Sequence, residues 1–246
     1  ARLVELADIR AELHAHTRES DGSMVIEELV ARAKERGFHT VAVTDHSKSS
    51  AFAGGLTVER LERHVDNVRR VAESTTGVRV LAGSEVDILP DGSLDYDDRT
   101  LALLDIVVAS PHAQLGMEGE KATTRLVRAV SHPRVAVLGH PTGRLIDRRV
   151  GLGADLGPVF AAARANRVAL EINAHWLRLD LRDVHVRAAV EAGCLIAIDC
   201  DVHAAGEFAN LRYGVATARR GWVTAAGCVN AWDADKLWEW LRSKKG

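Results

Sequence analysis

The sequence has 246 residues, of which 47% are hydrophobic and 27% are charged, and its formal net charge is −2. This composition is typical of an ordinary folded protein, and it excludes a disordered chain or a uniformly basic protein that coats nucleic acid. The length suits one closed α/β barrel, and no apolar run is long enough to cross a membrane.

Apolar runs and amphipathic segments alternate along the chain, which indicates parallel strands covered by helices. After an extended segment around His14, strands are predicted at 38–46, 78–86, 105–112, 135–141, 168–173 and 195–203. Helices are predicted at 25–36, 58–73, 97–104, 121–130, 156–166, 184–192, 207–219 and 233–242. The sequence therefore predicts an α/β protein with a seven-stranded (β/α)7 TIM-like barrel, in a single domain over 1–246.

The extended segment carries the first candidate site. Side chains two positions apart in a strand lie on one face, so His14 and His16 project together, and the turn that holds Asp21 can return a carboxylate to them. Imidazole is the commonest protein ligand of transition metals. A lone His-x-His is nevertheless a weak motif, more often a hydrogen-bonded pair than a metal site.

Later strands repeat the arrangement, because each ends in a residue that can bind metal. The strand-end residues are His46, Glu85, His112, His140 and the pair Asp201 and His203, which we expect to share one strand face. In a parallel barrel the carboxyl ends of all strands meet at one face. Taken singly, each side chain could cap a turn or bond its neighbour; together they would bury several polar groups without partners. Metal ions supply those partners.

Nine ligand candidates exceed what one ion can use, so we expect two or three divalent ions with a bridging carboxylate. Nitrogen and oxygen ligands without thiolate favour zinc, manganese or iron. Such a cluster can convert water into hydroxide and bind phosphoryl oxygens, which predicts phosphoester hydrolysis. The metal-ligand candidates are His14, His16, Asp21, His46, Glu85, His112, His140, Asp201 and His203, and all except Asp21 and His46 are also assigned as catalytic.

Basic residues near these strand ends are candidates for binding substrate phosphate. They are Lys48, Arg144, Arg148 and Arg149, with His175 after the sixth strand as a further candidate. Solvent-facing, solubilising charge is at least as common an explanation for any one arginine or lysine. The other histidines, at 39, 64, 132 and 185, are interpreted as structural or solvated. Asp45 should point away from His46 and support the site or cap a helix.

The motifs together resemble the PHP (polymerase and histidinol phosphatase) domain family. They are His14-x-His16 with Ser20-Asp21-Gly22, Thr44-Asp45-His46, Gly83-Ser84-Glu85, Ser110-Pro111-His112, Gly139-His140-Pro141 and Asp201-Val202-His203. The resemblance implies a distorted seven-stranded barrel with a trinuclear site. It places one ion on His14, His16, Glu85 and Asp201, a second on Glu85, His112 and His140, and a third on Asp21, His46 and His203.

Longer phrases at 85–92, 139–145 and 211–222 resemble the C-terminal PHP domain of bacterial family X DNA polymerases. That resemblance implies a metal-dependent 3′-to-5′ exonuclease that processes DNA 3′ ends or abasic sites in repair. It also implies an N-terminal polymerase-like or DNA-binding region outside these 246 residues. The sequence departs from the family at Glu12, at Cys200 and at His175-Trp176, where Asp, Thr and Asn-Pro are usual.

Three alternatives remain. A phosphomonoesterase of the histidinol-phosphatase type would act on small phosphate esters. An amidohydrolase also begins with His-x-His but usually needs a carboxylated lysine, and no predicted strand ends in lysine. A metal-bound module of a polymerase would have no catalytic activity. The three cysteines, 194, 200 and 228, form no close pair and suit buried positions in a reducing compartment, so we expect a cytoplasmic protein.

Overall fold

The computed structural model describes residues 2–244, and its centre is a parallel sheet in the order β1-β2-β3-β4-β5-β6-β7. The strands are β1 (Ala11–Glu12), β2 (Thr40–Val43), β3 (Arg79–Asp87), β4 (Ile106–Ser110), β5 (Val135–Leu138), β6 (Ala169–Asn173) and β7 (Leu195–Asp199). A bridge between Ala15 and Val202 joins the first and last strands. The predicted seven-stranded, nearly closed barrel is confirmed.

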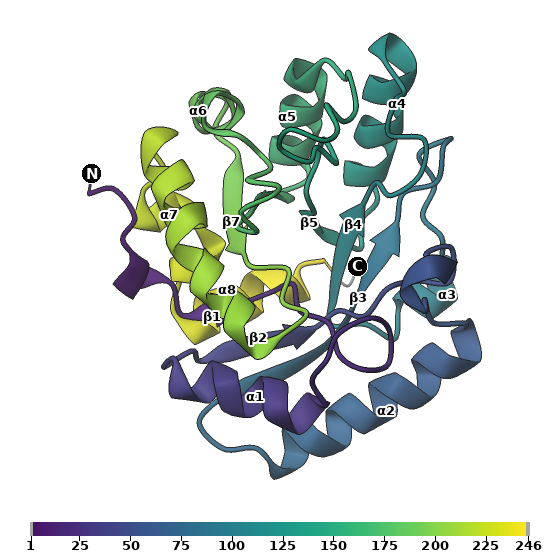
Figure 1. Cartoon of the computed structure of the whole chain (residues 1–246), viewed down its shortest axis with the longest axis vertical. Helices are drawn as coiled ribbons and strands as arrows, with labels where there is room; N and C mark the ends of the chain where they lie inside the picture. Colours follow the sequence, from purple (N-terminus) through teal and green to yellow (C-terminus); the bar gives the residue numbers. More distant parts are fainter. Residues whose placement is uncertain (1, 245–246) are drawn as a thin grey trace.

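Helices surround the strands, with α1 and α2 along one side and α4 to α7 along the others (Figure 1). The α-helices are α1 (Ile26–Glu35), α2 (Val58–Ser74), α3 (Asp98–Leu101), α4 (Gly119–Val130), α5 (Leu156–Ala165), α6 (Asp183–Glu191), α7 (Leu211–Arg220) and α8 (Ala234–Arg242). Short 3-10 turns, η1 to η5, cover Leu6–Asp8, Ala51–Ala53, Ala205–Asn210, Ala225–Gly227 and Val229–Ala231. Over residues 2–244, no helix has the length and apolar character that crossing a bilayer requires.

The structure differs from the prediction where β1 and β7 approach the site. β1 ends at Glu12 and β7 at Asp199, so His14, Asp201 and His203 all lie beyond regular strands. Polar side chains take over the strand hydrogen bonds there: Leu13 N donates to Asp199 Oδ1 (2.8 Å), and Cys200 N donates to Glu12 Oε1 (3.0 Å). The expected helix at 207–219 is likewise divided into a 3-10 turn and α7.

Helix α8 closes one end of the barrel and leaves the other end for polar residues. Trp240 and Leu241 of α8 belong to the same buried cluster as Leu13, Leu81 and Ile106 from the strands. The indole of Trp240 donates to the carbonyl of Arg167, which immediately precedes Val168 and β6 (2.9 Å). The apolar end therefore lies at the amino ends of the strands, opposite the predicted site.

Asn230, which is fully buried, links the two strands that close the barrel. Its Oδ1 accepts from Ile198 N (2.8 Å), and its Nδ2 donates to Ala11 O (3.1 Å) and Asp199 Oδ1 (2.7 Å). One side chain thus satisfies polar groups of both β1 and β7. A buried amide that bonds two strands fixes their relative position more firmly than apolar contact alone.

We expect Asn230→Ala to lower the free energy of unfolding by about 2–4 kcal/mol, because it leaves a buried N–H and a buried carbonyl without partners. Urea unfolding monitored by circular dichroism measures the change. The matched control is Asn166→Ala, since Asn166 is exposed and its side-chain amide makes one local bond to Ala162 O. Equal stability of the two variants would contradict the role given to Asn230.

Candidate metal centre

All nine predicted metal-ligand residues come together at the carboxyl end of the barrel. Their potential ligand atoms form three overlapping groups, with every atom of a group within 4.8 Å of the others. The groups are His14, His16, Glu85 and Asp201; His16, Asp21, His46 and His203; and His46, Glu85 and His112. His140 joins them through Glu85, whose Oε1 lies 2.8 Å from His140 Nε2.

Glu85, at the end of β3, is the centre of this arrangement. Its side chain is 1% exposed, and each of its two oxygens faces more than one imidazole. Oε2 lies 3.0 Å from His46 Nδ1, 3.3 Å from His14 Nε2 and 3.5 Å from His16 Nε2, and Oε1 lies 3.2 Å from His112 Nε2. A carboxylate surrounded in this way offers an oxygen to each of two neighbouring groups of imidazoles.

Two aspartates complete the ring of acceptors around the histidines. Asp201 Oδ1 lies 3.0 Å from His16 Nε2, and Asp201 takes a left-handed backbone conformation (φ 54°) that turns the chain after β7. Asp21 Oδ1 lies 3.2 Å from His203 Nε2, and Asp21 Oδ2 lies 3.5 Å from His46 Nε2. The side chains of Asp21 and His203 are about one-third exposed, so they form the mouth of the site above the buried Glu85.

Unsatisfied buried atoms show that this donor set fits metal ions. Within the described part of the chain, His14 Nε2, both ring nitrogens of His16, Glu85 Oε2 and Asp201 Oδ1 are buried without a hydrogen bond. Native proteins rarely leave buried polar atoms unpaired, and here they face one another. Imidazole nitrogens and carboxylate oxygens without thiolate suit zinc, manganese or iron. The residues therefore fit two or more divalent ions.

A layer of buried acceptors orients the candidate ligands from behind. Glu171 of β6 contacts His14 Nδ1 at 2.6 Å and accepts from the backbone N of His140 at 2.5 Å. Asp87 bonds Nδ1 of His112, and Asn173 Nδ2 donates to Asp201 Oδ2 at 3.0 Å. Such partners fix the tautomer and orientation of a ligand. The sequence analysis did not identify these three: Glu171 lies inside β6, and Asp87 and Asn173 end β3 and β6 but contact the candidate ligands only through the tertiary fold.

Asp45 supports the site from outside, as its predicted orientation requires. Its carboxylate accepts from Thr17 N (2.9 Å), Thr17 Oγ1 (2.7 Å) and Ser20 Oγ (2.5 Å), and it lies 2.8 Å from His64 Nε2 of α2. These contacts hold the turn that carries Asp21. The buried His64 is thus structural, as predicted.

Carboxylates raise the pKa values of four histidines, His14, His46, His112 and His203, so these rings are protonated when no metal is bound. Burial opposes the charge, but Glu85 and Asp21 raise the pKa of His46 to about 10. Glu85 likewise outweighs burial and raises the pKa of His112 to about 9, and Asp21 does the same for His203. These protons must leave before the nitrogens can bind an ion.

Two other histidines are already neutral and ready to act as ligands. Burial, together with the charges of His46 and His203, lowers the pKa of His16 to about 4. Burial and the nearby charge of Arg178 lower the pKa of His140 to about 3. The metal-free site thus combines protonated and neutral imidazoles around one carboxylate.

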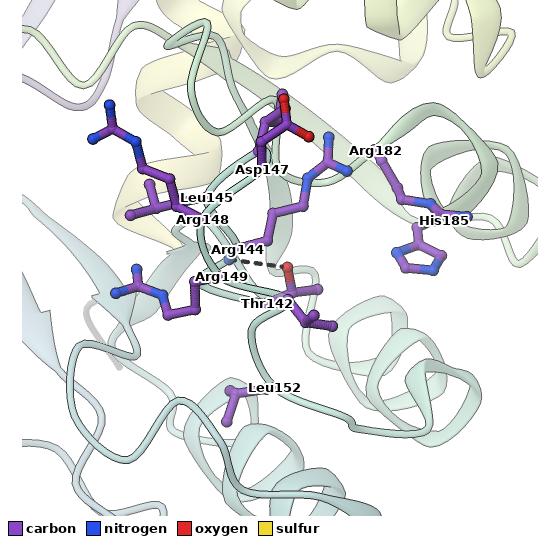
Figure 2. Close-up of a pocket in the computed structure, with 11 residues that line it drawn as sticks. Thr142, Arg144, Leu145, Asp147, Arg148, Arg149, Leu152, Arg182 and His185 are labelled. Atoms are coloured by element: carbon purple, nitrogen blue, oxygen red, sulfur yellow. Dashed lines mark hydrogen bonds between the residues drawn. The ribbon is translucent and has the colours of Figure 1, made fainter.

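Of the predicted phosphate-binding residues, Lys48 and Arg144 have other contacts. The Lys48 ammonium lies over the Tyr96 ring at 5.8 Å, and the Arg144 guanidinium donates to the carbonyls of Arg178 (2.8 Å) and Leu179 (2.7 Å). Arg148 is exposed and lines a cleft formed by the loop after β5 (Figure 2).

Arg178 is the cation nearest to the site, and the sequence reasoning missed it. Its Nε lies 3.6 Å from Asp201 Oδ2. His175, in the same loop after β6, is half-buried. Burial lowers its pKa, while the nearby Asp201 raises it and His203 lowers it. Arg178 lies five residues beyond the end of β6, so a rule based on strand ends does not identify it.

Comparison with known proteins places this chain among metal-dependent phosphoesterases and their relatives. The PHP domain family matches residues 12–175. The DNA polymerase/3′-5′ exonuclease PolX of Bacillus subtilis is 39% identical over 93% of this chain, and the chain spans 40% of that protein's length. A protein of Thermoanaerobacter sp. named "probable phosphatase" is 26% identical over 94% of both chains.

Two solved structures share the fold. The hisK protein of Listeria monocytogenes aligns with a TM-score of 0.60 and 16% identity, over 80% of this chain and 96% of its own. A histidinol phosphate phosphatase of Lactococcus lactis, solved with zinc, L-histidinol and phosphate, aligns with a TM-score of 0.56 and 14% identity, over 87% and 94%.

We expect Glu171→Gln to weaken metal binding by roughly 10- to 100-fold, because an amide cannot accept from both His14 and the His140 backbone. Competition with a fluorescent zinc chelator measures the affinity. Glu73→Gln, at an exposed position of α2, removes the same charge away from the site and is the matched control. Unchanged zinc affinity in the Glu171 variant would contradict this role.

Metal uptake should release protons at neutral pH, since His46, His112 and His203 have pKa values raised from 6.5 to about 9 or 10. Apparent metal affinity should therefore rise with pH up to about 9. The stability that these protonated histidines give the metal-free protein is complete below pH 6.5 and is lost as pH rises through 9–10. Titration with an indicator dye in weak buffer measures the protons, and uptake without release would refute the charge assignment.

Proposed function

The chain belongs to the PHP domain family, and from this premise we propose that it removes nucleotides from DNA 3′ ends by metal-dependent hydrolysis. The general activity is metal-dependent hydrolysis of phosphoester bonds, and both the family and the chemistry of the site support it. The specific activity that we propose is that of a 3′-to-5′ exonuclease, which also processes damaged or abasic 3′ ends in DNA repair.

Three sets of side chains would hold two or three ions of zinc, manganese or iron. The first set is His14, His16, Glu85 and Asp201; the second is Glu85, His112 and His140; the third is Asp21, His46 and His203. When bound, such ions activate a water molecule and neutralise charge on a phosphoryl group. His16 also lies close to the third set, and His46 lies close to the second set. Neighbouring ions would therefore lie near shared ligands.

The chain's own residues determine how a phosphate approaches. Glu85 and His14 are fully buried at the floor, whereas Asp21 and His203 are partly exposed at the mouth, so substrate enters from their side. Arg178, whose side chain is 21% exposed beside Asp201, presents a guanidinium to a phosphate there. The floor orients ligands, and the mouth admits the diester.

The similarity to the Bacillus subtilis polymerase and exonuclease is the main reason for proposing DNA as the substrate. It extends over 93% of this chain at 39% identity, against 26% for the protein named a phosphatase. A second candidate is hydrolysis of a small phosphate monoester. The Lactococcus lactis structure with histidinol and phosphate favours it, although at 14% identity that likeness concerns the fold. Both candidates use the same floor of ligands.

The test is incubation of the protein and manganese with 5′-labelled single-stranded DNA, beside histidinol phosphate and p-nitrophenyl phosphate. Stepwise shortening of the DNA supports the exonuclease. A strong preference for the small esters supports the phosphatase. Loaded protein that hydrolyses none of them would be a metal-bound module without catalytic activity, and the proposal would be lost.

We expect His46→Ala and Asp201→Ala each to reduce hydrolysis at least about 100-fold while the barrel stays folded, because each removes a ligand needed to activate water. Initial rates on labelled DNA, with circular dichroism and elemental analysis of the same samples, measure the effect. His132→Ala is the control, since His132 pairs with the exposed Asp98 away from the site. Normal turnover of either ligand variant with full metal content would overturn the assignment.

A further inference from the structure

A cleft of about 600 Å³ lies between the loop that follows β5 and the start of α6 (Figure 2). It falls within the range of ligand pockets, about 300–1,000 Å³. The charged side chains that line it are Arg144, Asp147, Arg148, Arg149 and Arg182, with His185 beside them. Four arginines and one aspartate share this cleft in a chain whose overall charge is negative.

The arginines of this cleft are only partly balanced by carboxylates, because Asp180 and Asp183 act on Arg144 without forming an ion pair with it. Within residues 2–244, none of the four forms an ion pair, whereas the neighbouring Arg220 pairs with Asp183 at 2.6 Å. Arg149 donates to the carbonyl of Gly143 (2.8 Å), which fixes its direction without neutralising its charge. Adjacent unpaired cations repel one another, and an anionic ligand would remove that repulsion.

The wall of the cleft is rigidly built from two cross-linked loops. Thr142 N and Gly143 N donate to Asp180 Oδ2 at 3.0 and 2.9 Å, and Ile146 N donates to Leu177 O at 2.7 Å. Asp180 is fully buried. The arginines are therefore presented by a backbone that is already ordered, which reduces the entropy cost of binding.

The cations are spread along the cleft, and the loop that carries Arg178 joins the cleft to the metal centre. Figure 2 shows Arg148 and Arg149 on one side of the loop, Arg182 beside His185 on the other, and Arg144 between them. Arg144 donates to the carbonyls of Arg178 (2.8 Å) and Leu179 (2.7 Å), and Arg178 Nε lies 3.6 Å from Asp201 Oδ2. Such a row suits several successive phosphates better than one isolated phosphate.

An exposed aromatic side chain lies in the loop that carries Arg178. Trp176 is 55% exposed and stacks on His175, with ring centroids 5.9 Å apart. It lies two residues before Arg178 in the loop braced by Asp180. Bases of single-stranded nucleic acids stack on such rings regardless of sequence.

We infer that Trp176 and the arginines of this cleft form a groove that binds the single strand leading into the metal centre. Trp176 would stack a base next to the cleaved phosphate, and the arginines would contact the following backbone phosphates. This inference rests on the proposed function and deepens it, because it assigns a substrate several nucleotides long instead of a small phosphate ester.

Binding of fluorescein-labelled oligothymidylates of 2, 4, 8 and 16 nucleotides to the zinc-loaded protein tests the inference. Phosphorothioate linkages at the 3′ end prevent hydrolysis, and fluorescence anisotropy at several salt concentrations gives Kd. Affinity should increase with length beyond two nucleotides. The double variant Arg148→Ala/Arg182→Ala should bind the 16-mer at least tenfold more weakly, with a salt slope smaller by about 0.7 per lost phosphate contact.

The controls separate the groove from general charge and from stability. Arg164→Ala removes one exposed arginine at the α5 end near Arg167, where α8 closes the barrel, and should bind like the unaltered chain. Trp176→Ala should weaken the 16-mer roughly tenfold, whereas Trp176→Phe should retain most of the affinity. An arginine double variant that binds like the Arg164 variant, or affinity independent of length, would overturn the groove. Shortening of DNA by the unaltered chain tests the proposed function separately.

Discussion

The structure depends on one buried carboxylate surrounded by imidazoles. Glu85 is removed from water at the end of β3, and five histidines from four segments face its two oxygens. Isolated, such a charge would be very costly to bury, so the fold requires compensating positive charge there. Protons on His46 and His112 supply it in the metal-free protein, and divalent ions would supply it when bound. Protonated histidines and bound metal ions would thus meet the same requirement, which is positive charge beside the buried Glu85.

Below the ligands lies a layer of acids that joins the site to the closure of the barrel. Burial and Asp199 raise the pKa of Glu12, and burial and Glu171 raise the pKa of Asp199 to about 7. These side chains replace backbone bonds between β1 and β7, where the strands are too short to pair fully. The seam of the barrel is therefore polar, and the candidate ligands His14 and Asp201 stand directly on it.

The sequence predicted the barrel and the convergence of nine side chains because both follow from local rules. Strand period and strand ends place His14, Glu85 and His140 on one face without any knowledge of distant contacts. Glu171 and Asp87 could not be found in this way, since their importance comes from which ring they meet across the barrel. Arg178 was missed because it lies five residues beyond the end of β6, outside any rule based on strand ends. The first strand was predicted, but its early end at Glu12 was not, because beyond it the Asp199 side chain takes the place of a backbone partner.

The two loops tied together through Asp180 have a consequence for how this protein can change. They carry the cations and the exposed indole, and within the described chain their one candidate metal ligand is His140, at the start of the loop after β5. Replacements such as His175-Trp176 therefore alter the rim while the catalytic floor keeps its geometry. Single substitutions at the rim can therefore change which substrates bind, while the candidate metal ligands below stay unchanged.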